Sequence, residues 1–248
     1  MQVPSLIRQR VRQASLLRVS NARILEGSLG GMEARFAGGV RFLLVAIGTS
    51  ACTGVISPPP VPKIYVADAS NNRIVRMDDM SGAGWTPFGT SGSGMNQFNS
   101  PTGIFVSAGQ IYVADWNNNR IVRMNDMAGT GWTAFGTHGS GMNQFDGPFG
   151  VSVSAGQIYV ADRNNNRIVR MNDMTGVGWT EFGTFGNGPN QFSSPFGIFA
   201  GAGQIFVVDT FNSRIVRMDD MTGAGWTPFG TSGSGPNQFN LPVRVFLQ

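Results

Sequence analysis

The 248-residue sequence predicts an all-β fold assembled from repeated four-stranded antiparallel sheets. The stretch IYVADASNNRIVRM begins at Ile64 and returns in closely similar form at Ile111, Ile158 and Ile205, so that successive copies start 47 residues apart. Each copy is rich in Ile, Val and Tyr, which favour strands. Many of the 35 glycines fall between these runs, where short strands need tight turns.

Each complete repeat is expected to contain four strands, and the second repeat illustrates them. Its strands cover residues 103–108, 111–115, 120–124 and 132–135. Gly109 opens a tight turn between the first two strands. The Asn-rich segment 116–119 makes the next turn, because Asn tolerates positive φ and hydrogen-bonds its own backbone. A long polar loop after the fourth strand leads to Pro148 and the next repeat.

Repeated four-stranded units of this length are typical of β-propeller blades, which pack face to face around an axis. Both faces of each sheet are then buried, which explains why the strands are nearly continuous apolar runs. The first copy lacks its first strand, and the chain ends in a strand-like segment over 242–248. We therefore expect four blades, closed by this C-terminal strand beside the hairpin that begins at Ile64. The alternatives are a fragment that completes a larger ring with another chain and a truncated gene remnant.

Three aromatic positions recur in all four copies, and we interpret them as packing between blades. A large aromatic side chain buries roughly 150–250 Å², which suits the margin of a sheet better than an isolated ligand contact. The positions are Trp85, Trp132, Trp179 and Trp226, then Phe88, Phe135, Phe182 and Phe229, then Phe98, Phe145, Phe192 and Phe239.

The copies resemble the NHL repeat. The run D-x-x-N-x-R-I follows I-Y-V-A or a close variant in every copy, and the complete copies begin with P-x-G-I or P-x-G-V. This resemblance covers residues 62–248 and implies a β-propeller. Members of the family usually have five or six blades, whereas this sequence has four copies. The motif is specific for the fold and indicates little about function.

The basic charge of the chain lies in its N-terminal segment. Seven of the 18 Lys and Arg residues fall in residues 1–52, against two of the 14 Asp and Glu residues. The repeats are left with 11 basic and 12 acidic residues, and Lys63 is their only lysine. A domain with so little net charge has no positive field to hold phosphates, so we expect no nucleic-acid partner.

Residues 1–52 are interpreted as a basic leader with an export signal. Arg35 and Arg41 precede an apolar run over 42–47, and small residues then lead to Cys52, as in a secretory signal. The run is too short to cross a bilayer as a helix, which needs roughly 20 residues. Residues 48–52 resemble a bacterial lipobox, although Thr49 stands where that family prefers leucine, so Cys52 is the lipidation candidate.

The expected location is therefore the periplasm or the cell surface of a bacterium, with a lipid anchor at Cys52 as the one route to a membrane. Met32 is a candidate for the true start of translation. The Pro-rich residues 53–62 are expected to form an extended tether to a propeller over 63–248. The alternative for the leader is a short buried apolar helix with an ordinary free cysteine.

The differences between the copies gather on one predicted face of the propeller. The turn between the second and third strands shares this face with the long loop to the next blade. Trp, Arg and Phe, which appear there, are the residue types that dominate binding interfaces. The alternative is neutral drift on exposed loops after recent duplication. The binding-face candidates are Trp116, His138, Phe149, Arg163, Phe185, Phe196 and Phe211.

Each copy also carries an Asp at the end of its second strand and an Arg five residues later. We expect a hydrogen-bonded pair that locks the intervening turn. Four carboxylates around one axis could in principle hold Ca²⁺ instead. The expected turn pairs are Asp68–Arg73, Asp115–Arg120, Asp162–Arg167 and Asp209–Arg214.

Common catalytic patterns are missing from the sequence. His138 is the only histidine and Cys52 the only cysteine, whereas zinc sites need several His or carboxylate ligands and a Cys nucleophile needs a His partner. We expect a monomeric, non-enzymatic module, without cofactor or metal, that binds a protein, peptide or glycan. Some NHL-like propellers are metal-dependent lyases and related propellers are lactonases, so a calcium-assisted enzyme that uses the Asp ring is the second option. A purely structural repeat protein is the third.

Overall fold

The computed structural model describes residues 23–26, 32–35, 41–44 and 62–247. The chain divides into two compact units, Met1–Pro59 and Pro60–Gln248. The first unit contains one antiparallel sheet in the order β1-β2-β3, formed by β1 (Arg23–Glu26), β2 (Met32–Arg35) and β3 (Arg41–Leu44). Cys52, the apolar residues 45–47 and most of the expected tether lie outside the described residues, and with them the lipidation prediction.

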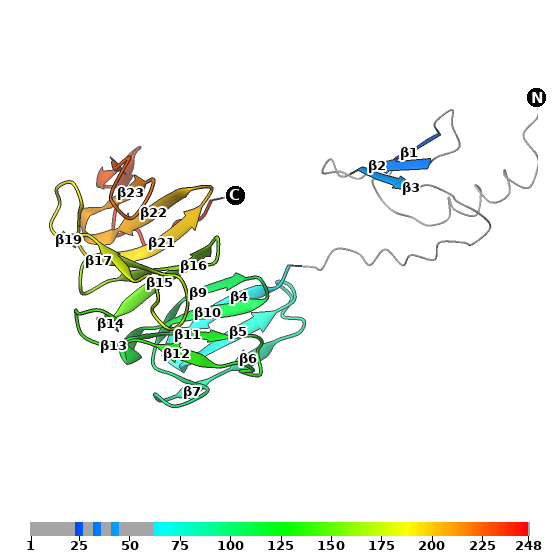
Figure 1. Ribbon diagram of the computed structural model, residues 1–248, viewed down its shortest axis with the longest axis horizontal. Helices are drawn as coiled ribbons and strands as arrows, with labels where there is room; N and C mark the ends of the chain where they lie inside the picture. Colours follow the sequence, from blue (N-terminus) through cyan, green and yellow to red (C-terminus); the bar gives the residue numbers. More distant parts are fainter. Residues whose placement is uncertain (1–22, 27–31, 36–40, 45–61, 248) are drawn as a thin grey trace, which may run out of the picture. The chain divides into compact units, whose positions relative to one another are not determined.

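The second unit is all-β and consists of four consecutive antiparallel sheets, the blades (Figure 1, from cyan to orange). Blade 1 contains β4 (Ile64–Asp68), β5 (Arg73–Met77) and β6 (Thr86–Phe88). Blade 2 contains β9 (Pro101–Ser107), β10 (Gln110–Asp115), β11 (Arg120–Met124) and β12 (Thr133–Phe135). Blade 3 contains β15 (Pro148–Ser154), β16 (Gln157–Asp162), β17 (Arg167–Met171) and β18 (Thr180–Phe182). Blade 4 contains β21 (Pro195–Gly201), β22 (Gln204–Asp209), β23 (Arg214–Met218) and β24 (Thr227–Phe229).

The predicted strands of the second repeat match blade 2 to within two residues at each end. The pairing is sequential: Tyr112 of β10 faces Phe105 of β9 on one side and Arg123 of β11 on the other. Every residue of β10 from Ile111 to Asp115 is buried, although alternate side chains point to opposite faces of the sheet. Both faces of the blade are therefore covered, as the continuous apolar runs indicated.

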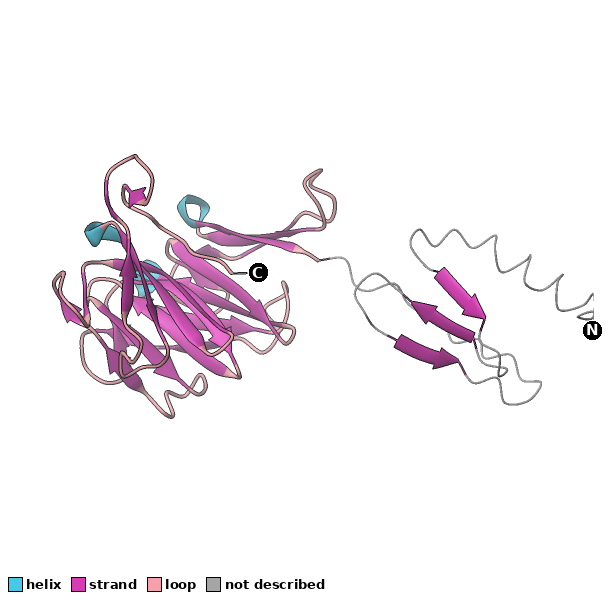
Figure 2. Cartoon of the chain, turned by 90° about the horizontal axis from the view of Figure 1, so that it is seen from above, coloured by secondary structure: helices cyan, strands magenta, loops and turns pink. Residues whose placement is uncertain are grey.

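Short elements connect the blades. Within a blade, three of the four turns between second and third strands contain a 3-10 helix: η1 (Ala69–Asn71), η2 (Trp116–Asn118) and η3 (Thr210–Asn212), drawn in cyan in Figure 2. Each long loop contains a two-stranded parallel ladder that the sequence did not predict. These ladders are β7 (Thr90–Ser91) with β8 (Gln97–Phe98), β13 (Thr137–His138) with β14 (Gln144–Phe145), β19 (Thr184–Phe185) with β20 (Gln191–Phe192), and β25 (Thr231–Ser232) with β26 (Gln238–Phe239).

Nine of the twelve recurrent aromatic residues pack between blades, as we interpreted them; Trp85, Phe229 and Phe239 have no such partner among the described residues. Trp132 of blade 2 lies 6.2 Å from Phe88 and 5.4 Å from Phe98, measured between ring centroids, and both Phe residues belong to the preceding repeat. The same contact recurs twice more, with Trp179 over Phe135 and Phe145 and Trp226 over Phe182 and Phe192. Phe98, Phe145 and Phe192 are fully buried as a result.

The expected closure by the C-terminal strand is wrong for the structure as folded. Residues 242–247 form no strand, and the sheet of β4, β5 and β6 keeps three strands. Instead, the segment lies beside β21 in space: a Cβ added to Gly197 would be only 2.7 Å from the carbonyl oxygen of Val243. It thus takes the place of an innermost strand of a following blade, but β4 does not pair with it.

The reason lies at Arg244. Gly103 of β9 and Gly150 of β15 stand at the position that Arg244 occupies in the last segment. Each lets its strand approach the next innermost strand so closely that a Cβ would lie 2.5 Å from a backbone carbonyl oxygen there. Arg244 replaces this glycine in the last segment, and its side chain extends to the carbonyl oxygen of Thr102 in β9, 3.4 Å away. A residue with a Cβ at this position cannot make the close approach that glycine allows, and a side-chain hydrogen bond links the last segment and β9 instead.

Candidate functional site

Five of the seven predicted binding-face residues form one continuous cluster, which we call the aromatic face: Trp116, Phe149, Arg163, Phe196 and Phe211. Ring centroids are 6.0 Å apart for Trp116 and Phe149, 4.4 Å for Phe149 and Phe196, and 6.2 Å for Phe196 and Phe211. The cluster draws on blades 2, 3 and 4. Residues up to 95 positions apart in sequence therefore share one surface.

Local backbone geometry places these side chains. Trp116 opens η2, the turn that ends at Asn119 in the left-handed conformation with φ of 54°. The next residue, Asn117, donates its backbone N–H to the carbonyl oxygen of Asn99 in the preceding long loop, at 3.1 Å. Phe211 makes the equivalent bond to Ser193. The turns and the long loops are thus tied together on one face, as the sequence predicted.

Arg163 is the central charge of the aromatic face. Its guanidinium carbon lies 5.2 Å from the ring centroid of Trp116 and 4.6 Å from that of Phe196, which is the range of cation–π attraction. Within residues 62–247, no carboxylate forms an ion pair with it. Partial burial lowers the pKa of Arg163 from its usual value, but an arginine stays charged at neutral pH. An aromatic-stacked cation therefore faces the surface without a counter-ion from this part of the chain.

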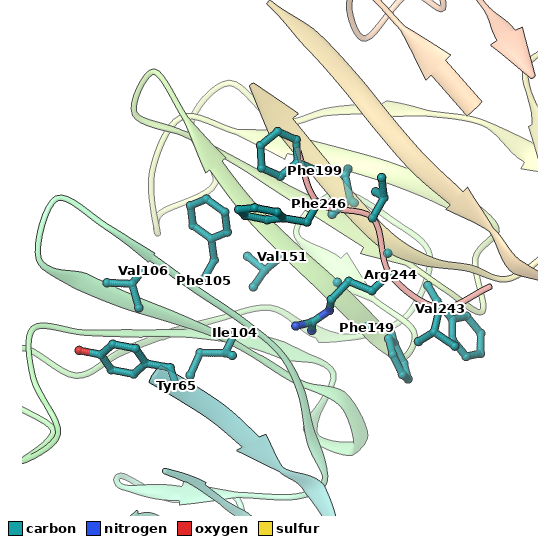
Figure 3. A pocket seen from close by; sticks show the side chains of 15 residues that line it. Tyr65, Ile104, Phe105, Val106, Phe149, Val151, Phe199, Val243, Arg244 and Phe246 are labelled. Atoms are coloured by element: carbon teal, nitrogen blue, oxygen red, sulfur yellow. The ribbon is translucent and has the colours of Figure 1, made fainter. Parts of the chain in front are cut away.

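Behind the aromatic face lies a cavity of about 350 Å³, which Phe149 and Phe196 also line. Its walls are mainly apolar residues of β9, β15 and β21 and of the C-terminal segment, and Arg244 is its one charged lining residue (Figure 3). Phe246 packs against Phe199 with ring centroids 5.8 Å apart.

The cavity was missed by the sequence analysis. The signal that could have found it is the replacement of the recurrent glycine by Arg244, because only a side chain at that position keeps the innermost strands apart.

His138 and Phe185 do not join the aromatic face. Both lie at the ends of the short ladder strands β13 and β19, and Phe185 is 72% exposed. His138 Nε2 is 3.8 Å from Asp146 Oδ1, and its side chain is also 72% exposed. Their place on the loops agrees with the sequence, but the structure gives them no contact with the other five residues.

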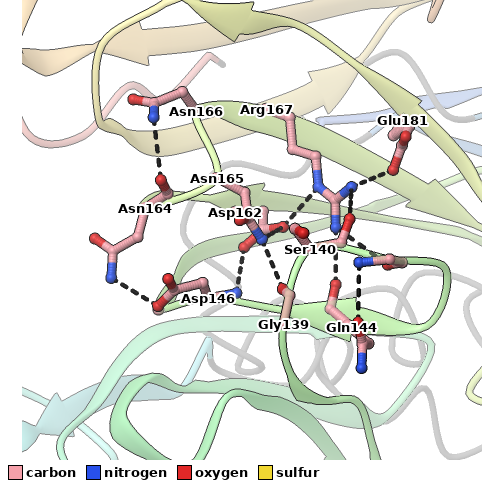
Figure 4. A network of polar contacts seen from close by, with 12 residues as sticks. Gly139, Ser140, Gln144, Asp146, Asp162, Asn164, Asn165, Asn166, Arg167 and Glu181 are labelled. Atoms are coloured by element: carbon pink, nitrogen blue, oxygen red, sulfur yellow. Dashed lines mark hydrogen bonds and ion pairs between the residues drawn. The ribbon is translucent and has the colours of Figure 1, made fainter.

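Each predicted Asp–Arg pair spans its turn, with Arg Nε to Asp Oδ2 distances of 2.7, 2.8, 2.8 and 2.7 Å along the chain. The network around Asp162 and Arg167 shows the pattern (Figure 4). Asp162 also accepts bonds from the Asn165 side chain and from the backbone of Asp146. Arg167 donates further to loop carbonyls of the preceding repeat and pairs with Glu181. The pairs of blades 2, 3 and 4 thus hold both their own turn and the neighbouring loop.

Burial changes the electrostatics of these pairs along the chain. Burial raises the pKa of Asp115 and Asp162 above the ordinary value, although hydrogen bonds from Asn and Arg side chains and from the backbone oppose the rise. The pKa of Asp68 is instead lowered, first by the Asn71 side chain and then by Arg73. The same motif is therefore a buried ion pair inside the propeller and a solvated one in blade 1.

The donor set for a metal is weak in the part of the chain that the structure describes. No group of three or more His, Cys, Asp or Glu side chains there comes together as a metal site. The ring of Asp residues does not converge, because each carboxylate is used by its own Arg and Asn neighbours. Among the same residues, no helix has the length and hydrophobicity needed to span a bilayer.

Antiparallel four-stranded blades joined by aromatic packing define a β-propeller. The NHL repeat model matches residues 98–124 and 145–171. The first match runs from the end of β8 to the end of β11, and the second from the end of β14 to the end of β17. The chain is therefore a β-propeller that contains NHL repeats in these two segments, and the NHL resemblance stated from the sequence is confirmed there.

Solved structures with this fold include both enzymes and a binding protein. A streptogramin B lyase structure matches with a TM-score of 0.51 and 16% identity, over 88% of this chain and 67% of that one. A nidogen/laminin complex matches with a TM-score of 0.52 and 17% identity, over 79% of this chain and 70% of that one. Virginiamycin B lyase from Staphylococcus aureus matches with a TM-score of 0.51 and 18% identity, over 89% of this chain and 72% of that one. A comparison with curated proteins finds no match. These low identities establish the fold alone.

Proposed function

We propose that this propeller is a non-enzymatic, exported binding module that presents its aromatic face to a protein, peptide or glycan. The observation that carries the proposal is the guanidinium of Arg163 held between Trp116 and Phe196 with no carboxylate bound to it among the described residues. The planar guanidinium has donors left for a partner's carboxylate or carbonyl groups, while the rings hold it in place.

The composition of the aromatic face supports a binding role. Trp, Arg and aromatic side chains clustered in one patch are the usual centres of interface energy. Phe211 is 55% exposed, and the other four members are half-buried. The cavity behind Phe149 and Phe196 gives space for an apolar group of the partner. The nidogen/laminin complex is one structure in which a similar fold takes part in a protein complex.

Drift after duplication explains why loop positions differ, but not why the differing residues contact one another. Trp116 replaces Ala69 of the first copy, and Arg163 stands at the same position in the third. Each substitution alone would expose a large side chain. Together, Trp116 packs on Phe149 and Arg163 stacks on Phe196. The position of these two Phe residues also varies, because Thr102 occupies it in the second repeat. Matched changes on three blades favour a functional surface.

The calcium-assisted lyase or lactonase remains the second candidate, and the fold similarity to two lyases favours it. Such an enzyme would need the recurrent Asp carboxylates to give up their hydrogen bonds to Asn and Arg side chains in order to bind Ca²⁺. A ligand that binds only the folded state raises the melting temperature. We expect the same melting temperature in excess Ca²⁺ and in excess chelator; a clear rise with Ca²⁺ would favour the enzyme.

Export is proposed from the basic leader and the short apolar run before Cys52. Fractionation of a bacterial host that expresses the full chain provides the test. We expect the protein in the periplasmic or envelope fraction, and its retention in the cytosol would contradict export.

The aromatic face is tested by replacing Trp116, Arg163 and Phe211 together with alanine. Because the ligand is unknown, the probes are a random peptide phage library and a glycan array. We expect ligands selected on the wild-type chain to bind the triple variant at least roughly 30-fold more weakly, since interface centres contribute about 2 kcal/mol or more. Isothermal titration with the selected ligand measures the change.

The matched control is Phe185→Ala, which removes an equally large and more exposed aromatic residue outside the aromatic face. It should leave the affinity unchanged. Equal affinity of the triple variant and the wild type would refute the site assignment, and equal losses in both variants would indicate that the selected ligand binds elsewhere.

A further inference from the structure

The joint between consecutive blades is built from the same apolar contact three times. In each joint, a Trp of the later blade covers two Phe residues of the earlier repeat, as Trp132 covers Phe88 and Phe98. The Met in the turn that precedes the Trp is also buried in the later joints: Met174 is 5% exposed and Met221 is 6% exposed. One side of the joint supplies the Trp and the Met, and the other supplies the Phe pair.

A polar contact accompanies the apolar one in every joint. Arg120 donates to the carbonyl oxygens of Ser93, Gly94 and Gln97 in the preceding loop, at 2.6, 3.3 and 2.9 Å. Arg167 and Arg214 make the equivalent bonds to the loops before them. The later blade therefore always provides donors, and the earlier loop always provides carbonyl acceptors.

Blade 1 carries the later half of such a joint with nothing against it among the described residues. Trp85 is 53% exposed and Met80 is 87% exposed, unlike their buried or half-buried counterparts in later blades. Arg73 bonds only Asp68 within the described residues, so its two terminal nitrogens lack the three carbonyls that Arg120 has. Among the described strands, blade 1 also has no innermost strand, so the edge of β4 has no partner there.

Blade 4 carries the earlier half. Phe229 is 53% exposed, and Phe239, although 6.1 Å from Phe229, has no Trp over it among the described residues. Ser234, Gly235 and Gln238 correspond to the three residues that accept from Arg120, and no arginine of the described chain donates to them.

We propose that these two end faces join between copies of this chain, head to tail. Trp85 of one copy covers Phe229 and Phe239 of the next, and Arg73 donates to the loop carbonyls there. The interface is heterologous, so it forms a closed ring or an open chain according to the rotation at each joint.

A second copy fits these faces better than the other end of the same chain. The three internal joints impose a fixed curvature, and at that curvature Arg244 stands between the last segment and β9, where Gly103, Gly150 and Gly197 stand between the other neighbouring innermost segments. A joint between copies is not bound to this curvature, so the Trp85 face and the Phe229 face can meet without bringing Arg244 into a close approach with β9. The expectation of a monomer rested on closure within the chain, which the structure does not form.

The test is the solution mass of the full chain by sedimentation velocity over a range of concentrations. We expect a mass at least twice that of the monomer at high concentration. Trp85→Glu blocks one end face and Phe229→Glu blocks the other, so each variant alone should be monomeric. A mixture of the two should recover a dimer, because one intact Trp85 face and one intact Phe229 face remain.

Recovery in the mixture also shows that both variants are folded, since a misfolded chain cannot supply an intact face. Phe185→Glu, an equally drastic change outside the end faces, should keep the wild-type mass. A monomeric wild type at every concentration would overturn the proposal, as would variants that keep the wild-type mass. A mixture that stays monomeric would overturn the head-to-tail pairing.

Discussion

Asp115→Ala is expected to lower the free energy of unfolding by about 3–5 kcal/mol, the usual cost of removing one partner of a buried ion pair. Asp115 is completely buried, and the side chain of its partner Arg120 is 12% exposed. The carboxylate accepts hydrogen bonds from Arg120, from the Asn118 side chain and from the backbone of Asn99. The variant leaves all three donors, one of them charged, without this acceptor.

Two other copies of the same pair serve as matched controls. Asp162→Ala should cost less than Asp115→Ala, because Glu181 still pairs with Arg167, whereas Ala134 stands at the corresponding position beside Arg120. Asp68→Ala should cost least, because its pair is solvated, with side-chain exposures of 25% for Asp68 and 33% for Arg73.

Urea unfolding followed by tryptophan fluorescence measures the three differences at one protein concentration. The expected order of destabilisation is Asp115→Ala, then Asp162→Ala, then Asp68→Ala. Equal losses in all three variants would show that the pairs act only within their own turns and that burial between blades contributes nothing.

Much of the fold could be predicted from the sequence, because its strongest signals are local and repeated. Runs such as Ile111–Asp115 carry strand propensity, and Gly and Asn mark the turns, so four strands per repeat follow directly. The Trp132 contact with Phe88 and Phe98 could be predicted as blade packing for the same reason. The short parallel ladders of the long loops were missed because two-residue strands have no periodicity.

Closure and the cavity could not be predicted in the same way, because they depend on distances between strands that are far apart in sequence. The last segment has the composition of an innermost strand, and its pattern alone favours pairing with β4. Whether it pairs depends on Arg244, whose effect is visible only beside Thr102 and the glycines of the other joints. The cavity follows from the same residue.

The aromatic face was predictable in part. Comparison of the copies identified its five members, since each stands at a position that varies among the repeats. The same comparison also selected His138 and Phe185, which vary equally but lie on ladder strands away from the cluster. Variation alone marks exposed positions, and only the three-dimensional structure separates those that contact one another.

Phe145→Ala is expected to destabilise the protein by about 3–5 kcal/mol, the usual cost of removing a fully buried aromatic side chain. Phe145 is completely buried, 5.3 Å from Trp179 and 6.3 Å from Phe135 between ring centroids. Neighbouring strands cannot collapse into the space, because Trp179 is also held by Arg167 at 5.7 Å. The cavity left by the ring therefore persists, and urea unfolding measures its cost.

Phe239→Ala is the matched control, because Phe239 occupies the same position of the last repeat but lacks a covering Trp in the described chain. At low protein concentration its loss should be less than half that of Phe145→Ala, and equal losses would contradict the assignment of Phe239 to an open end face. Under the head-to-tail joint proposed above, the stability of the wild type rises with protein concentration. Phe239→Ala should remove that rise, whereas Phe145→Ala should keep it, because an internal joint is complete at any concentration and an end face becomes complete only when a second copy covers it.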